Sequence, residues 1–182
     1  MTGIRLETDR LVLREFTEED IPAVLAYQRT PEYQRLRGRD RYTLAEARQF
    51  VATFIGWQFE SPRLRYQLAI SLKSHPRFIG TCGVRVQRPE VGEATIGYEL
   101  DPAYWGQGYA TESSERILSF AFGELGLRRV IAWCHVDNSG SIRVLEKLGM
   151  RREGRSENSA AVPKRWRNHY CFALAAPWSA NF

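Results

Sequence analysis

The sequence predicts an α/β (α+β) fold with a mixed, mostly antiparallel central sheet flanked by helices. Stretches with strand-like alternation take turns with stretches of helical spacing, without an internal repeat, a low-complexity segment or a flexible linker. Three strand-like stretches also follow one another in the middle of the chain, separated only by short turn sequences, as in an antiparallel meander. The expected order of elements is β-α-α-β-β-β-α-β-α-β-β.

The size and composition of the chain suit one folded domain. The 182 residues are 43% hydrophobic and 12% aromatic, so residues 1–182 are expected to form a single domain with a sizeable core. No apolar run approaches the roughly 18 residues that a membrane helix requires. The first residues lack the apolar core of a signal peptide. We therefore expect a cytoplasmic protein without a membrane partner.

Helix-start signals mark the N-terminal third of the chain. A strand is expected over residues 10–16, and Thr17 then caps a helix with acidic residues in its first turn. Thr43 and Glu46 have the spacing of a capping box. The apolar positions behind these two starts recur at helical spacing, and they are Ile21, Val24, Leu25, Ala47, Phe50, Val51 and Phe54.

The rest of the chain reads as strands and helices punctuated by turn residues. The expected strands cover residues 65–72, 78–87, 93–100, 129–136 and 166–173. A helix over 111–125 is expected to end at Gly126, and a second helix containing Ile142 and Leu145 is expected to end at Gly149.

Cysteine, histidine and charge patterns exclude some functions. Cys82, Cys134 and Cys171 lie inside strand-like runs without metal-ligand spacing, and the three histidines are scattered, so we expect no metal site. The net charge of +5 comes with clusters of arginine. Because no nucleic-acid-binding motif accompanies them, we expect a solvated surface and attraction for a polyanionic cofactor rather than direct nucleic-acid binding.

The most informative segment lies between the expected strand 93–100 and the helix that follows it. This segment is Trp105-Gly106-Gln107-Gly108-Tyr109-Ala110-Thr111-Glu112. Glycines allow a sharp bend and a close approach to a ligand, and the N-terminus of the next helix offers unpaired N–H groups and partial positive charge. The segment therefore predicts a phosphate site. It is neither the dinucleotide fingerprint nor a P-loop, since their further residues are missing.

In its wider context this segment resembles a known family. Residues 96–112, Ile-Gly-Tyr-Glu-Leu-Asp-Pro-Ala-Tyr-Trp-Gly-Gln-Gly-Tyr-Ala-Thr-Glu, closely resemble the acyl-CoA-binding segment of the GNAT superfamily of N-acetyltransferases. Asn138-Ser139-Gly140-Ser141 and residues 145–150 look like the next motif of that family. Residues 6–14, Leu-Glu-Thr-Asp-Arg-Leu-Val-Leu-Arg, and Trp166-Arg167-Asn168-His169-Tyr170 resemble its RimJ/RimL-type branch.

The resemblance implies acetyl-CoA as co-substrate. The main-chain N–H groups from Gly106 to Ala110 would cradle the diphosphate, with Thr111 starting the helix beneath it. Leu100 and its neighbours would pair through their main chain with the pantetheine amides, where two strands splay apart. The residues implied in cofactor binding are Leu100, Trp105, Gly106, Gln107, Gly108, Tyr109, Ala110, Thr111, Asn138 and Ser141.

The resemblance also implies direct attack of an amine on the thioester, which needs a base, a stabilised oxyanion and an acid for the leaving thiolate. Many relatives use a tyrosine as the acid where this chain has Leu145, so Ser141 is the substitute, with capping or cofactor contact as its alternative role. Glu99 and Glu157 are the candidate bases. The alternative for each is a solvent-exposed glutamate without a catalytic role. His135 and His169 are further alternatives that are more typical of ordinary sheet residues, and Asn168 stands where relatives commonly have Asp.

Without an evident strong base, a low-pKa amine is the favoured acceptor. We expect acetylation of a protein N-terminal α-amine of the ribosomal-protein type. Modification of a small molecule, such as an aminoglycoside antibiotic, and a non-catalytic acyl-CoA-binding module remain alternatives, as does a ribosome-associated binder that uses the arginines. The resemblance also allows a homodimer.

Overall fold

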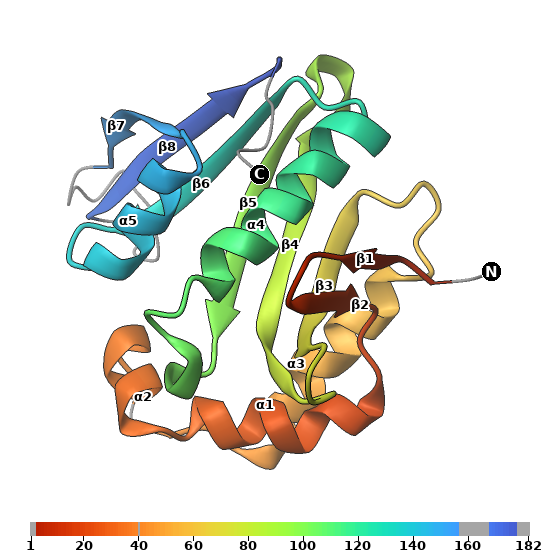
Figure 1. The fold of residues 1–182 in the computed structure, drawn as a ribbon, viewed down its shortest axis with the longest axis vertical. Coiled ribbons are helices and arrows are strands. Elements are labelled where there is room, and N and C mark those ends of the chain that lie inside the picture. The colour runs from red at the N-terminus through yellow and green to blue at the C-terminus, as the bar shows by residue number, and fades with distance from the viewer. Residues whose placement is uncertain (1–2, 40, 157–167, 178–182) are drawn as a thin grey trace.

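A computed structural model describes residues 3–39, 41–156 and 168–177, and in this part of the chain one eight-stranded sheet carries helices on both faces (Figure 1). The strand order is β1-β2-β3-β4-β5-β6-β8-β7, and every neighbouring pair is antiparallel except β5 and β6. The elements are β1 (Arg5–Glu7), β2 (Leu11–Arg14), α1 (Ile21–Gln28), α2 (Pro31–Arg37), α3 (Leu44–Trp57), β3 (Arg65–Leu72), β4 (Phe78–Arg88), β5 (Glu93–Leu100), α4 (Tyr109–Ser119), β6 (Arg129–His135), α5 (Ser139–Lys147), β7 (Arg151–Arg155) and β8 (His169–Ala175).

The mixed, mostly antiparallel sheet confirms the expected fold class, with two elements added to the expected order. A short strand, β1, pairs with β2 as a hairpin. A short helix, α2, follows α1, because Pro31 occupies its first turn and the Thr30 hydroxyl accepts the N–H of Tyr33. The capping box of Thr43 and Glu46 starts α3 as expected, with the Thr43 N–H 2.9 Å from Glu46 Oε2.

Alternating side chains of the sheet contribute to two hydrophobic cores, one on each face. One core lies under α4 and α5, and Ala94, Ile96 and Leu100 of β5 belong to it. The other lies under α1, α2 and α3, and is rich in aromatic residues such as Phe16, Tyr27 and Tyr33. Residues of β5 with odd numbers, including Glu99, therefore face the α1–α3 side.

Strands β5 and β6 pair only where both begin. Their parallel register runs from Glu93 opposite Arg129 to Thr95 opposite Ile131 and stops there. The Glu93 carboxylate binds the guanidinium groups of Arg88 and Arg129, which holds the paired ends together. Beyond Thr95, β6 continues beside β8 and leans away from β5 (Figure 1).

The helix after the glycine segment begins two residues earlier than expected and has an unusual end. Gly108 is its N-cap, so Tyr109 rather than Thr111 is its first residue, because the left-handed φ of Gly108 already directs the chain into the helix. After Ser119 the chain continues as a π-helical turn, Phe120–Glu124, and ends before Gly126, whose φ is 63°. In the described part of the chain, no helix has the length and hydropathy needed to cross a bilayer.

Candidate active site

The segment from Trp105 to Gly108 forms a tight loop between β5 and α4. Gly106 and Gly108 have φ angles of 74° and 85°, in the left-handed region that favours glycine. A Cβ added to Gly106 would have no atom within 4 Å, so the space beside this residue is open. The loop is exposed and leads into α4, whose first N–H groups have no partners within the helix. This geometry suits a phosphate group.

Trp105 connects the loop to the end of β5 through its side chain. Its indole Nε1 donates a hydrogen bond to the main-chain oxygen of Leu100 at 2.9 Å, while 40% of the residue is exposed. The carbonyl of Leu100 therefore accepts one hydrogen bond within the protein, from the Trp105 indole. The N–H of Asp101 donates to the main-chain oxygen of Ile79 in β4. Successive N–H groups of a strand point to alternate sides, so those of Leu100 and Tyr98 point away from β4, toward the opening where β5 no longer pairs with β6.

The other predicted residues of this loop lie where the helix starts. Tyr109, Ala110 and Thr111 form the first turn of α4 and are partly exposed. The Gln107 side chain is exposed, and its amide donates to the carbonyl of Ala103 at 3.0 Å. The main-chain groups of these residues, rather than their side chains, are thus the ones that line the bend.

Ser141 lies at the start of α5 and is paired with a tyrosine that the sequence analysis missed. Asn138 caps the helix, since its Oδ1 accepts the N–H of Ser141 at 3.0 Å. The Ser141 hydroxyl is 2.9 Å from the phenol oxygen of Tyr98. Burial raises the pKa of Tyr98, although the Ser141 contact works in the opposite direction. Leu145, in the place of the usual tyrosine, is only 1% exposed.

Glu99 lies in a cluster of tyrosines on the other face of the sheet. The phenol of Tyr27 donates to one carboxylate oxygen, and the phenol of Tyr33 donates to the other at 2.9 Å. The rings of Tyr27 and Tyr33 meet edge to face with centroids 5.1 Å apart. Burial first, and then the charge of Glu99, raise the pKa of both phenols, so they stay protonated donors at neutral pH.

Glu99 and Ser141 therefore approach the opening between β5 and β6 from opposite sides. Consecutive residues of a strand point to opposite faces, so Tyr98 carries Ser141 on the α5 side while Glu99 faces α1 and α2. A reacting group in the opening would have a carboxylate on one side and a hydroxyl pair on the other. Such an arrangement can accept a proton from one partner and donate a proton to another.

The remaining candidates are peripheral or lie outside the described residues. Glu157 is among the residues that the structure does not describe. His135 and His169 are register partners at the ends of β6 and β8, as expected of sheet residues, with ring centroids 5.3 Å apart. Among the described residues, no group of three or more His, Cys, Asp or Glu is placed to hold a metal ion, and Cys82, Cys134 and Cys171 are free thiols.

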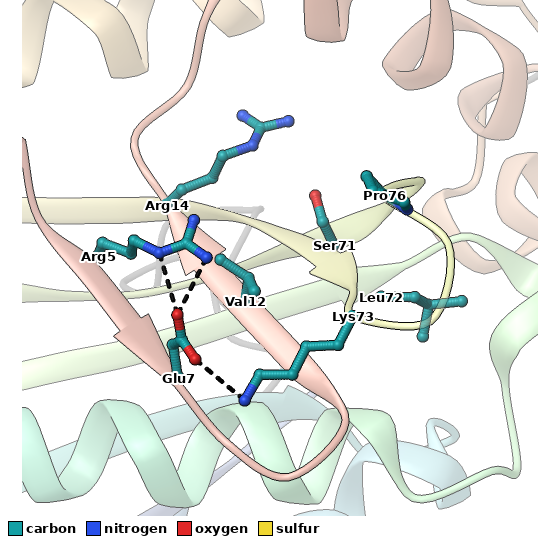
Figure 2. Close-up of a pocket in the computed structure, with 8 residues that line it drawn as sticks. All are labelled: Arg5, Glu7, Val12, Arg14, Ser71, Leu72, Lys73 and Pro76. Carbon is teal, nitrogen blue, oxygen red and sulfur yellow. Dashed lines mark hydrogen bonds and ion pairs between the residues drawn. The ribbon is translucent and has the colours of Figure 1, made fainter.

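A separate depression of about 460 Å³ lies on the β1–β2 hairpin (Figure 2). Its charged groups already have partners, because Glu7 binds Arg5 and Lys73, each at 3.0 Å, and Arg14 binds Asp20 outside the depression. It contains neither the glycine loop nor Glu99, so we do not assign the chemistry to it.

Comparison with known proteins places this arrangement in a family. The acetyltransferase (GNAT) domain model matches residues 10–151. The relative YoaA from Bacillus subtilis, described as an uncharacterized N-acetyltransferase, is 34% identical over 150 residues, which span 82% of this chain and 84% of YoaA.

Solved structures share the fold. A GNAT-family acetyltransferase from Bacillus anthracis matches with a TM-score of 0.81 and 26% identity, over 94% of this chain and 98% of that chain. The structure of RimL, a ribosomal L7/L12 alpha-N-protein acetyltransferase, matches with a TM-score of 0.79 and 20% identity, over 96% of each chain. From the family model and the YoaA similarity together, the chain belongs to the GNAT family of N-acetyltransferases and is an acyltransferase.

Proposed function

We propose that this enzyme transfers an acetyl group from acetyl-CoA directly to the α-amine of a protein N-terminus, with ribosomal proteins as the first candidates. The observation that carries the proposal is the position of the glycine loop. It begins α4 beside the end of β5, where β5 has separated from β6 and where Glu99 and the Tyr98–Ser141 pair approach from opposite sides. A diphosphate-binding bend and a proton-transfer site are thereby adjacent.

The residues present fit acetyl-CoA, which GNAT enzymes use. When bound, it supplies an activated acetyl thioester. The N–H groups from Gly106 to Ala110, with Thr111 in the same helical turn, would bind the diphosphate, because the left-handed glycines and the open space beside Gly106 leave the bend accessible. The N–H groups of Tyr98 and Leu100 would donate hydrogen bonds to the amide carbonyls of the pantetheine chain and to the acetyl carbonyl oxygen, which becomes negative during the transfer. Asn138 holds Ser141 in place.

For proton transfer we assign Glu99 as the base, directly or through one water, and Ser141 as the donor to the leaving sulfur. The phenols of Tyr27 and Tyr33 fix the Glu99 carboxylate in one orientation. The phenol of Tyr98 can donate to the Ser141 hydroxyl, whose own proton then points elsewhere. Glu157 stays a second candidate base on the sequence alone.

The preference for an α-amine follows from proton energetics. An α-amine with a pKa of about 8 costs about 1.4 kcal/mol to deprotonate at pH 7, whereas a lysine with a pKa of about 10.4 costs about 4.6 kcal/mol. Glu99 already accepts hydrogen bonds from two phenols, which makes it a weak base, and a weak base suffices for the amine that costs less to deprotonate. The name of RimL, an alpha-N-protein acetyltransferase that shares this fold, supports the same acceptor class.

Thiol release from acetyl-CoA with two matched peptides tests the proposal. One peptide carries a free α-amine and no lysine, and the other has the same sequence with a blocked α-amine and one internal lysine. We expect faster turnover of the first peptide, and faster turnover of the lysine would refute the acceptor class. Faster release with aminoglycosides than with either peptide would favour the small-molecule reading. Binding of acetyl-CoA with no release for any amine would favour the non-catalytic module.

A further inference from the structure

The turn between β1 and β2 packs against the glycine loop, but it contributes no residue to the candidate site around Glu99 and Ser141. The turn covers residues 8–10, and its last residue is Arg10. The Arg10 Nη1 donates to the main-chain oxygen of Gln107 at 3.1 Å. Its guanidinium carbon also lies 4.4 Å from the centroid of the Tyr109 ring. One side chain therefore contacts both the bend of the loop and the first residue of α4.

The same side chain holds a carboxylate in the first turns of α4. Arg10 Nε donates to Glu112 Oε2 at 2.6 Å, and the Arg10 N–H donates to Glu112 Oε1 at 3.0 Å. The Thr8 hydroxyl donates to the same oxygen. Burial opposes ionisation of Glu112, but these hydrogen bonds outweigh it and lower the pKa of the carboxyl. Glu112 is thus ionised, and its negative charge in the first turn of α4 is paired with the Arg10 guanidinium.

The contact with Gln107 also fixes the direction of a donor. In a trans peptide unit the C=O and the following N–H point in opposite directions. Because the Gln107 carbonyl points at Arg10, the N–H of Gly108 points away from the hairpin, toward the exposed side of the loop. A Cβ on Gly108 would lie 3.3 Å from Arg10 Nη2, so the two residues are closely fitted.

We propose that Arg10 is a positioning residue for the cofactor. It orients the Gly108 N–H toward the diphosphate of acetyl-CoA, and its positive charge offsets the repulsion between that diphosphate and the Glu112 carboxylate. This inference rests on the proposed function, because it assigns the diphosphate to the loop. Lysine cannot replace the arginine, since the contacts with Gln107, Glu112 and the Tyr109 ring need a planar group with several donors.

The test compares three variants of the full chain by calorimetric titration with CoA and by steady-state kinetics with acetyl-CoA. Arg10→Gln is expected to weaken CoA binding roughly tenfold, as for the loss of a charge-assisted hydrogen bond, and to raise KM for acetyl-CoA similarly while kcat changes less than about twofold. Arg10→Lys is expected to behave like Arg10→Gln. Arg5→Gln is the matched control, because Arg5 belongs to the same hairpin but pairs with exposed Glu7 (Figure 2), away from the glycine loop, and it is expected to leave CoA affinity unchanged.

Each outcome separates this inference from the function on which it rests. Failure of the unaltered protein to bind CoA would overturn the proposed function. Normal CoA binding by Arg10→Gln, or recovery of full affinity by Arg10→Lys, would overturn the positioning role alone. Arg10→Lys keeps the charge and the aliphatic stem, so its affinity decides the question if Arg10→Gln does not fold. Loss of kcat with unchanged KM would also contradict the inference, because it would place Arg10 in the chemical step.

Discussion

Tyr33→Phe tests the contact that holds Glu99. The substitution removes one hydroxyl, which donates to Glu99 Oε2 at 2.9 Å, and leaves a ring that is 2% exposed and packed against Tyr27 and Tyr42. A hydrogen bond to a charged group contributes roughly 1.5–3 kcal/mol. We therefore expect the free energy of unfolding to fall by about 2 kcal/mol and the melting temperature by about 4–8 °C in a chain of this size.

Tyr66→Phe is the matched control. The Tyr66 phenol donates to the main-chain oxygen of Arg63 at 2.9 Å, so the acceptor is neutral while the substitution is chemically the same. The expected loss is about 1 kcal/mol. Urea unfolding at pH 8, followed by circular dichroism, measures both variants. Equal losses in the two variants would contradict the charged contact.

Alkaline pH provides an independent readout of the same contact. Burial and the Glu99 charge raise the pKa of Tyr33 above the value of about 10 that a tyrosine has in the unfolded chain. The stabilisation is complete below pH 10, and above it the unfolded chain releases the proton while the folded chain retains it. The unaltered protein should therefore lose about 1.4 kcal/mol per pH unit from this group, and Tyr33→Phe should not. A difference between the two proteins that stays constant up to pH 11 would refute the reasoning.

Two further pairs of substitutions, each a test with its control, address the loop and the α5 hydroxyl. Gly108→Ala and Gly126→Ala both place a Cβ at positive φ, and each is expected to cost about 1–2 kcal/mol of stability. Only Gly108→Ala, at the bend, is expected to weaken CoA binding measured by calorimetry. Equal CoA affinity of the two variants would show that the loop does not bind CoA. Ser141→Ala is expected to lower kcat at least about tenfold at unchanged KM for acetyl-CoA, while Ser139→Ala, exposed in the same helical turn, leaves kcat intact. A full kcat in Ser141→Ala would remove the serine hydroxyl from the chemical step.

The elements that the sequence predicted well are those decided by local rules. The strands 65–72 and 93–100 agree with β3 and β5 at both ends, because alternation and flanking turn residues are local signals. The capping box at Thr43 and the glycines after α4 and α5 are likewise local. Helix α2 was missed despite a local signal, the Thr30-Pro31 start, because it has only seven residues and buries Tyr33 alone, so it shows little apolar periodicity.

The surroundings of the candidate site depend on long-range packing and could not be predicted in the same way. Glu99 meets Tyr27 and Tyr33 across 72 and 66 residues of sequence, so no spacing rule connects them. Tyr98 is different, because it directly precedes Glu99 in the same strand and therefore points to the opposite face of the sheet. Strand alternation alone could have marked it as a partner for the α5 side. The hydrogen bond from the Trp105 indole to the Leu100 carbonyl also depends on the fold of the loop, so no local sequence signal predicts it.

The brief pairing of β5 with β6 has a wider consequence. An exposed strand margin normally invites another protein to add a strand, which makes it an aggregation hazard. Here the unmatched margin of β5 lies in the middle of the sheet and ends beside the glycine bend. Under the function proposed above, the amides of the acetyl-CoA chain would pair with this margin, so the bound cofactor would also cover an otherwise open strand edge.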